Sequence, residues 1–278
     1  MKHKSLIDSL LNAAVVAVLL MALAPFYFMI TTAFKTAVAS VAYPPQLFPN
    51  PVTGKHFIDV LTPSVFPFTR YFLNSLIVAS VTSSVAVIVG GLGAYSFARL
   101  PVPGKRTLLK LTFVVYMFSG ILLVVPLFRI FAMIGLYDTR PAVIIACLVS
   151  TLPAAISMLG NYFRTIPLSL EESAMMDGLT RVQCLYHIIL PLSIPAVMSV
   201  FVYVFMIAWN DFLFASIFLV DPRKMTLPVG LRQFFSSQDY VWGRMMAASI
   251  LTALPAIAMF AAVEKFMTGG LTAGGVKG

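Results

Sequence analysis

Few side chains in this sequence have the types and spacing to catalyse a reaction or guide a polar solute. Asp211 follows Trp209 and Asn210 inside an apolar stretch. A carboxylate at mid-membrane costs ~2.5–3.5 kcal/mol on an insertion scale, so Asp211 should face a cavity, a partner or the membrane boundary. We interpret Asn210 and Asp211 as candidate positions on a translocation path or gate. An interfacial or helix-packing pair is the equal alternative.

Neither a metal centre nor a nucleotide site is predicted. The three histidines, His3, His56 and His187, are too dispersed along the chain to share a metal ion. The Gly-rich tail comes closest to a phosphate-binding loop, but Val276 separates its glycine pair from Lys277, where G-x-x-x-x-G-K-[ST] needs Gly next to Lys. With no nucleophile constellation either, a membrane enzyme is a remote alternative.

One segment of mixed polarity, residues 171–195, stands between two long apolar runs and indicates two short helices. Ser169 and Glu172 predict a capping box for the first helix, and Gly178 predicts its left-handed end. Thr180 and Gln183 predict a second capping box. The second helix should carry an apolar stripe at i, i+3, i+4 and i+7, formed by Val182, Leu185, Tyr186 and Ile189. Two amphipathic helices on a membrane-embedded chain indicate a docking element.

The same segment resembles the "EAA" loop of ABC importer permeases. It reads Glu172-Ser173-Ala174, three residues, Gly178, nine residues, Ile188, one residue and Leu190-Pro191, with Ser173 where Ala is usual. In that family the loop sits in a cleft of a separate ATPase subunit and transmits its closure to the membrane helices. The resemblance implies that the ATPase-coupling residues are Glu171, Glu172, Ser173, Ala174, Asp177, Gly178, Ile188, Leu190 and Pro191. An ordinary amphipathic cytosolic linker is the alternative.

The C-terminal tail adds a second resemblance. Residues 269–278 are similar to the end of maltose-type sugar permeases, where the tail reaches into the ATPase dimer interface. This implies ATPase contacts for Gly274, Gly275 and Lys277, with a disordered Gly-rich end as the alternative. Residues 227–231, 242–243 and 209–211 also resemble this branch, whose outer loop faces the substrate-binding protein.

The composition is that of a polytopic membrane protein. Of the 278 residues, 60% are hydrophobic and 10% are charged, against roughly 25% charged in a soluble domain. The basic residues behind the net charge of +9 are scattered between apolar runs, which favours anionic lipid head groups over nucleic acid. Cys147 and Cys184 are predicted to be free thiols, because the expected topology gives them no shared oxidising compartment.

Apolar runs of about 20 residues, the length that crosses a bilayer, predict an all-α chain with six transmembrane helices in one permease domain, 1–278. The N-terminal run, although it resembles a signal peptide, is expected to remain as the first span. Six prolines make residues 35–70 an irregular loop outside the membrane. The expected spans are 11–34, 71–98, 107–132, 141–163, 191–220 and 245–267.

Helix packing and orientation follow from smaller signals. The second span carries small residues at four-residue spacing, which should let another helix approach closely: Ala86, Gly90, Ala94 and Ala98.

An even number of spans puts both termini on one side. The basic cluster at Arg99 to Lys110 favours the cytosol for that side, and the loop 164–190 must also be cytosolic if its partner hydrolyses ATP.

The resemblance therefore implies a type I ABC importer permease, most like the second membrane subunit of the maltose/oligosaccharide group, in a bacterial or archaeal cytoplasmic membrane. Its implied partners are a homologous second permease, two ATPase subunits, an extracytoplasmic solute-binding protein and membrane lipid, but no nucleic acid. ATP and Mg would be bound by the ATPase, with no cofactor in this chain. The alternatives are a glycerol-3-phosphate permease of the same class and an ion-coupled secondary transporter, which should show paired buried carboxylates in its two halves.

Overall fold

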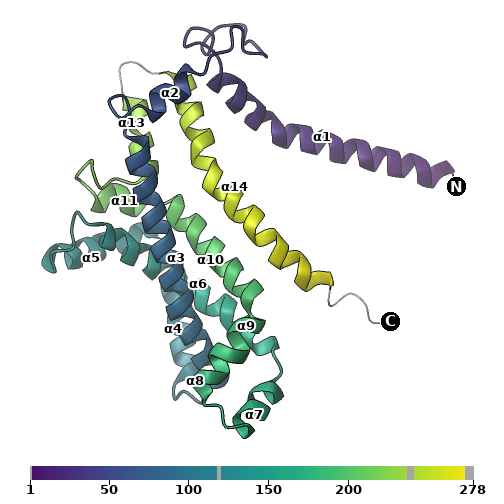
Figure 1. Cartoon of the computed structure of the whole chain (residues 1–278), viewed down its shortest axis with the longest axis vertical. Helices are drawn as coiled ribbons and strands as arrows, with labels where there is room; N and C mark the ends of the chain where they lie inside the picture. The colour runs from purple at the N-terminus through teal and green to yellow at the C-terminus, as the bar shows by residue number, and fades with distance from the viewer. Residues whose placement is uncertain (1, 118–119, 237–240, 273–278) are drawn as a thin grey trace. The chain divides into compact units, whose positions relative to one another are not determined.

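The computed structural model describes residues 2–117, 120–236 and 241–272, and over these ranges the chain is helical and contains no strand (Figure 1). The expected all-α class is confirmed. The elements are α1 (Lys2–Ala33), α2 (Lys55–Leu61), α3 (Phe68–Arg99), α4 (Lys105–Met117), α5 (Gly120–Met133), α6 (Arg140–Thr165), α7 (Leu168–Met176), α8 (Arg181–Cys184), the π-helix η1 (Leu185–Ile189), α9 (Leu190–Leu192), α10 (Ile194–Trp209), α11 (Leu213–Phe218), α12 (Leu227–Leu231), α13 (Gln233–Ser236) and α14 (Trp242–Thr272).

Among the described residues, four helical stretches are long and apolar enough to cross a membrane: residues 10–33, 68–99, 140–165 and 242–264. Residues 181–192 and 194–209 make a fifth if the pair, bent by 80°, is taken as one span. The expected third span, 107–132, is divided between α4 and α5, which lie on either side of residues 118–119. The expected fifth span, 191–220, is interrupted after Trp209, where α10 ends before α11 begins.

The chain forms two compact units, the first comprising residues 1–69 and 231–254. Here residues 10–30 of α1 present their large apolar side chains outward, as suits contact with lipid or another membrane helix. The expected irregular loop contains the short helix α2, which packs on the start of α14. Arg244 Nε lies 2.8 Å from Asp59 Oδ2, and a Cβ at Gly243 would come within 2.2 Å of the His56 ring.

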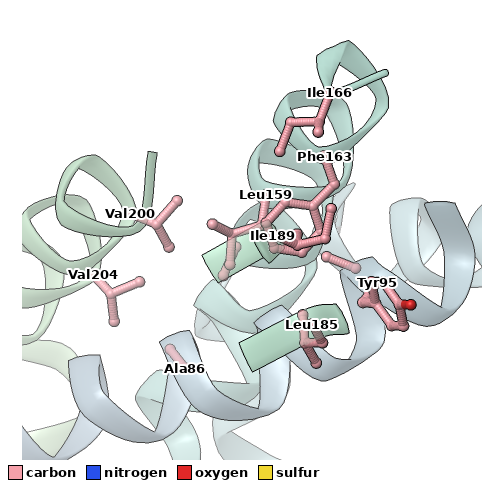
Figure 2. Close-up of a cluster of buried hydrophobic side chains, with 11 residues drawn as sticks. Ala86, Tyr95, Leu159, Phe163, Ile166, Leu185, Ile189, Val200 and Val204 are labelled. Carbon is pink, nitrogen blue, oxygen red and sulfur yellow. The ribbon is translucent and has the colours of Figure 1, made fainter. Parts of the chain in front are cut away.

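The second unit comprises residues 70–230 and 255–278 and holds the candidate site. Its central helix is α6, which contacts α4, α5, α10 and α11. A buried apolar cluster joins α3, α6, η1 and α10 through side chains that include Tyr95, Leu159, Phe163, Ile189 and Val204 (Figure 2). Through this cluster, the bent segment from η1 to α10 packs against both α3 and α6.

The small-residue stripe on α3 lies where that helix meets α6. Ala86 and Ala94 are fully buried, Gly90 is buried against Ala155, and Ala94 lies against Gly160. Ala98 packs partly buried at the edge of the same cluster. The expectation that this stripe permits a close helix approach is confirmed, since a Cβ at Gly90 would lie 3.2 Å from the Cβ of Ala155.

We expect Gly90→Val to destabilise the packing of α3 on α6 by about 1–3 kcal/mol, because the added methyl groups have no room beside Ala155. Gly91→Val is the matched control, since the nearest atom to its Cβ is 4.0 Å away and both changes place the same residue in the same helix. Thermal unfolding in detergent measures the difference. Equal melting temperatures for the two variants would show that Gly90 has no packing role.

Candidate functional site

The two ends of the second unit hold different loops. At one end, Arg99 of α3 donates hydrogen bonds to carbonyls at the end of α6. The helices α7 and α8 lie at this end (Figure 1). At the other end, Asn74 of α3 donates to the carbonyls of Arg223 and Met225. The loop 164–190 therefore lies on the same side as the C-terminal end of α3, as the expected topology requires.

The first helix of this docking loop (residues 164–190) begins earlier than the sequence suggested. Pro167 is its N-cap, with φ −57° and ψ 133°, and no side chain caps the helix. The predicted Ser169–Glu172 capping box is wrong, because Ser169 already lies inside the first turn and a capping residue must be extended. Glu172 is instead left free on the surface of α7.

The end of α7 is the turn that the sequence predicted. Gly178 has φ +91°, its N–H donates to Met175 O at 3.1 Å, and the N–H of Leu179 donates to Ala174 O at 3.0 Å. These two bonds form a Schellman motif, which needs the left-handed residue that Gly supplies. The predicted capping box of the next helix is also confirmed, with Thr180 and Gln183 bonded to each other.

The predicted apolar stripe of the second helix is divided between two faces. Leu185 and Ile189 are buried in the cluster of Figure 2, whereas Val182 and Tyr186 are exposed. Tyr186 and Ile189 both lie in the π-helix at 185–189, whose wider turn separates residues three apart more than an α-helix does. Over the whole docking loop, five large apolar side chains face outward: Leu168, Leu170, Met176, Val182 and Tyr186.

The two adjacent glutamates of the loop have opposite environments. Glu172 is exposed, but Glu171 is buried, with Oε1 2.6 Å from Arg99 Nε and Oε2 accepting a hydrogen bond of 3.0 Å from the Tyr95 hydroxyl. No pattern in the sequence distinguished the two, although Arg99 was noted as part of a basic cluster. Tyr95 and Arg99 are therefore residues of the site that sequence reasoning missed.

The other predicted coupling residues lie along the docking loop. Ser173, Asp177, Gly178 and Pro191 are exposed, and Ala174, Ile188 and Leu190 are half-buried. Gly274, Gly275 and Lys277 of the tail lie outside the described residues. Cys147 and Cys184 are free and buried, as expected.

Asn210 and Asp211 lie at the break between α10 and α11. The Asp211 carboxylate accepts hydrogen bonds from the backbone N–H of Ala215, at 2.9 Å, and of Phe214, at 3.4 Å, which caps the first turn of α11. The Asn210 side chain is exposed and donates to Met206 O. Asp211 thus has a structural partner, and its place on a translocation path remains a prediction.

We expect Asp211→Asn to fold and assemble like the parent protein, since its amide oxygen can still accept the N–H of Ala215, the shorter of the two capping bonds, and Asn caps helices about as well as Asp. Asp211→Ala should lose the cap at a cost of about 1 kcal/mol. If the charge serves the path, uptake by the Asn variant should fall while its melting temperature stays unchanged. If the Asn variant took up substrate as well as the parent, Asp211 would act only as the cap of α11.

A polar clamp closes the opposite end of the second unit, and sequence reasoning missed it as well. Asp138, at φ 55°, accepts hydrogen bonds from the N–H groups of Val220 and Asp221 and lies 2.6 Å from Lys224 Nζ. The Lys224 hydrogen bond, followed by the Asp221 N–H, lowers the pKa of Asp138 to about 2. The loop before α6 is thereby tied to the loop after α11.

Because the pKa of Asp138 is lowered in the folded protein, its stabilising contribution is present above the ordinary Asp pKa of roughly 4 and is lost as pH falls toward 2. We therefore expect hydrogen exchange at Val220 and Asp221, corrected for intrinsic rates, to be protected equally from pH 5 to 8. Asp138→Ala should remove the protection, and Asp138→Asn should retain most of it, since Asn also tolerates a positive φ. Unchanged protection in the Ala variant would show that the clamp does not order this loop.

The comparison with known proteins assigns the family. Residues 86–267 match the family described as binding-protein-dependent transport system inner membrane component. The chain belongs to this family. It is 53% identical over 260 residues to the inner membrane ABC transporter permease protein YcjP of Escherichia coli K12, covering 94% of this chain and 93% of that protein. It is 33% identical to the trehalose/maltose transport system permease protein MalG of Thermococcus litoralis, over the full length of both.

The fold agrees with this family. A solved bacterial ABC transporter involved in the import of the acidic polysaccharide alginate contains a chain that matches with a TM-score of 0.79 at 22% identity, covering 95% of this chain and 97% of that one. The resemblance to carbohydrate ABC permeases of the second-subunit type is confirmed. The protein is an inner membrane transport component.

Proposed function

We propose that this chain is the membrane-spanning permease subunit of an ATP-driven, binding-protein-dependent importer of sugars, with oligosaccharides as the substrate class. One observation carries the proposal: the docking loop presents an exposed acidic and apolar face at one end of the second unit while its inner face is fastened to α3 and α6. Relatives that match 84% and 100% of the chain and are named for trehalose and for trehalose/maltose transport support the substrate class.

The exposed face of the loop would bind one of two ATPase subunits, which supply ATP, Mg and hydrolysis. A homologous second permease would complete the membrane core, and an extracytoplasmic binding protein would deliver the sugar. In this arrangement the loop 164–190, both termini and the tail residues 274–277 lie in the cytosol, and 1–278 acts as one permease domain. Closure of the ATPase pair draws the docking loops together and turns the permease helices outward.

Uptake by the reconstituted complex tests this function. The chain, copurified with its partners in vesicles, should accumulate the sugar that its binding protein retains through purification, and only when ATP is supplied on the side of the docking loop. Uptake driven by an ion gradient without ATP would favour the secondary transporter and overturn the proposal. Retention of a phosphorylated polyol in place of a sugar would leave the transporter class intact but correct the substrate.

A further inference from the structure

We propose that Tyr95, Arg99 and Glu171 form an internal anchor that makes α7 and the end of α3 move as one body. On this proposal, which rests on the proposed docking of α7 on an ATPase, the three side chains are positioning residues that carry ATPase closure into the membrane helices. Glu171 then acts inside the permease, whereas Glu172 acts at the ATPase surface.

The attachment of α7 to the rest of the unit is polar. Glu171 is the single buried residue of α7, and the large apolar side chains Leu168, Leu170 and Met176 of the same helix are exposed. A nine-residue helix is too short to be stable alone in water, so its contacts decide where it sits. The position of α7 is therefore set by a charged side chain, through an ion pair with Arg99 and a hydrogen bond from Tyr95, and not by an apolar stripe.

Arg99 joins three helices through one guanidinium group. Its Nε lies 2.6 Å from Oε1 of Glu171 in α7, and its Nη2 donates to the carbonyls of Phe163, at 2.8 Å, and Ile166, at 2.5 Å. Phe163 lies in the last turn of α6 and Ile166 is its C-cap, where carbonyls lack the partners of the helix interior, although the Phe163 carbonyl also accepts the N–H of Ile166 at 3.3 Å. One guanidinium group therefore joins α3, α6 and α7, by two hydrogen bonds from Nη2 and an ion pair from Nε, where a lysine ammonium would be a single point charge.

Tyr95 extends the anchor to the second helix of the docking loop. It lies one turn before Arg99 on the same face of α3, and its hydroxyl is 3.0 Å from Glu171 Oε2 and 3.2 Å from the carbonyl of Arg181. Arg181 is the first residue of α8. Both helices of the docking loop are thus bonded to a single turn of α3, and the Tyr95 ring continues into the apolar cluster of Figure 2.

The burial of this pair is the reason to assign it a role beyond stability. The Arg99 and Glu171 side chains are 9% and 3% exposed. A buried ion pair loses so much hydration that apolar residues of similar size often stabilise a protein as well or better, whereas removal of one partner leaves an uncompensated charge. The stability of the fold therefore does not by itself require an ion pair at this position. A link that holds α7 to α3 in one position does require it.

Variants of the assembled complex separate a rigid link from simple packing. Arg99→Met should destabilise the chain, because it leaves the Glu171 charge buried and unpaired. The double variant Arg99→Met with Glu171→Leu should regain the parental melting temperature and still bind the ATPase. We expect its uptake per ATP hydrolysed to fall roughly tenfold, the size of a typical coupling between sites. The same exchange at the Arg244–Asp59 ion pair of the first unit, Arg244→Met with Asp59→Leu, is the control, and its uptake per ATP hydrolysed should stay parental.

The motion itself is measured by two spin labels, at Met176 of α7 and at Ile88 of α3, both exposed, in a chain whose Cys147 and Cys184 are replaced by Ala. Between the ATP-free and the ATP-trapped complex, the distance between the labels should stay constant in the parent and should change in the double variant.

Two results would overturn the anchor: a parental distance that changes on ATP trapping, or a double variant that transports with parental efficiency. If the parent binds no ATPase, the proposed function fails and the anchor fails with it. If the parent binds the ATPase but the distance between its two labels changes on ATP trapping, the anchor is overturned and the proposed function stands.

Discussion

Gly178→Pro is expected to abolish ATP-coupled uptake while the chain still inserts in the membrane. Proline fixes φ near −65°, whereas Gly178 has φ +91°, and it removes the N–H that donates to Met175 O. Loss of this Schellman motif should cost about 3 kcal/mol or more and redirect the chain between α7 and α8. Uptake in vesicles, with membrane insertion measured on the same preparation, checks the result.

Gly178→Ala separates backbone strain from loss of the donor. It keeps the N–H, and its Cβ meets nothing within 4 Å, so only the left-handed conformation is disfavoured, at about 1–2 kcal/mol. We expect partial uptake from the Ala variant. Full coupled uptake by the proline variant would contradict the role of this turn in placing the docking loop.

Glu172→Lys is expected to weaken ATPase binding at least about tenfold. The reversed charge would repel any ATPase group that pairs with the Glu172 carboxylate, and like-charge contacts at an interface cost several kcal/mol. The fold of the loop should be unaffected, because Glu172 is exposed and makes no cap with Ser169. Copurification of the ATPase at increasing salt measures the loss.

Glu171→Gln is the matched comparison, because it changes the neighbouring buried charge. It should keep ATPase binding while it weakens the bond to Arg99. If Glu172→Lys bound the ATPase as well as the parent at all salt concentrations, Glu172 would not belong to the interface.

Local features of the site were predictable from the sequence because they depend on neighbours in the chain. The turn at Gly178 depends only on the positive φ of that residue, and the Thr180–Gln183 capping box joins residues three apart in the chain. The periodic small residues on α3 likewise predicted a close helix contact, since side chains four apart share a helix face. Four of the six expected spans correspond to described helices that are long and apolar enough to cross a membrane: residues 10–33, 68–99, 140–165 and 242–264.

Other features depend on which face of a helix turns inward. The sequence predicted Ser169 as the cap of α7, but the cap is Pro167, two residues earlier, and no spacing indicated that Glu171 would be buried and Glu172 exposed. The sequence carries no simple signal for the π-helix at 185–189, and it did not show that Leu185 and Ile189 are buried while Val182 and Tyr186 are exposed.

Long-range polar contacts were the least predictable part. Asp138 and Lys224 are 86 residues apart, and Tyr95 and Glu171 are 76 apart, so no periodicity relates them. Each pair forms only because the helices between them return to the same end of the unit. The charges were visible in the sequence, but their partners were not.

Photocrosslinking from α7 tests the central claim most directly. A photoreactive amino acid in place of Met176, which is 88% exposed, should form an adduct with the ATPase subunit in the intact membrane complex. The same group in place of Tyr137, beside Asp138 at the opposite end of the second unit, should form none with the ATPase. ATPase adducts from position 137, or none from position 176, would contradict the account of residues 164–190 as the element that couples this permease to ATP hydrolysis.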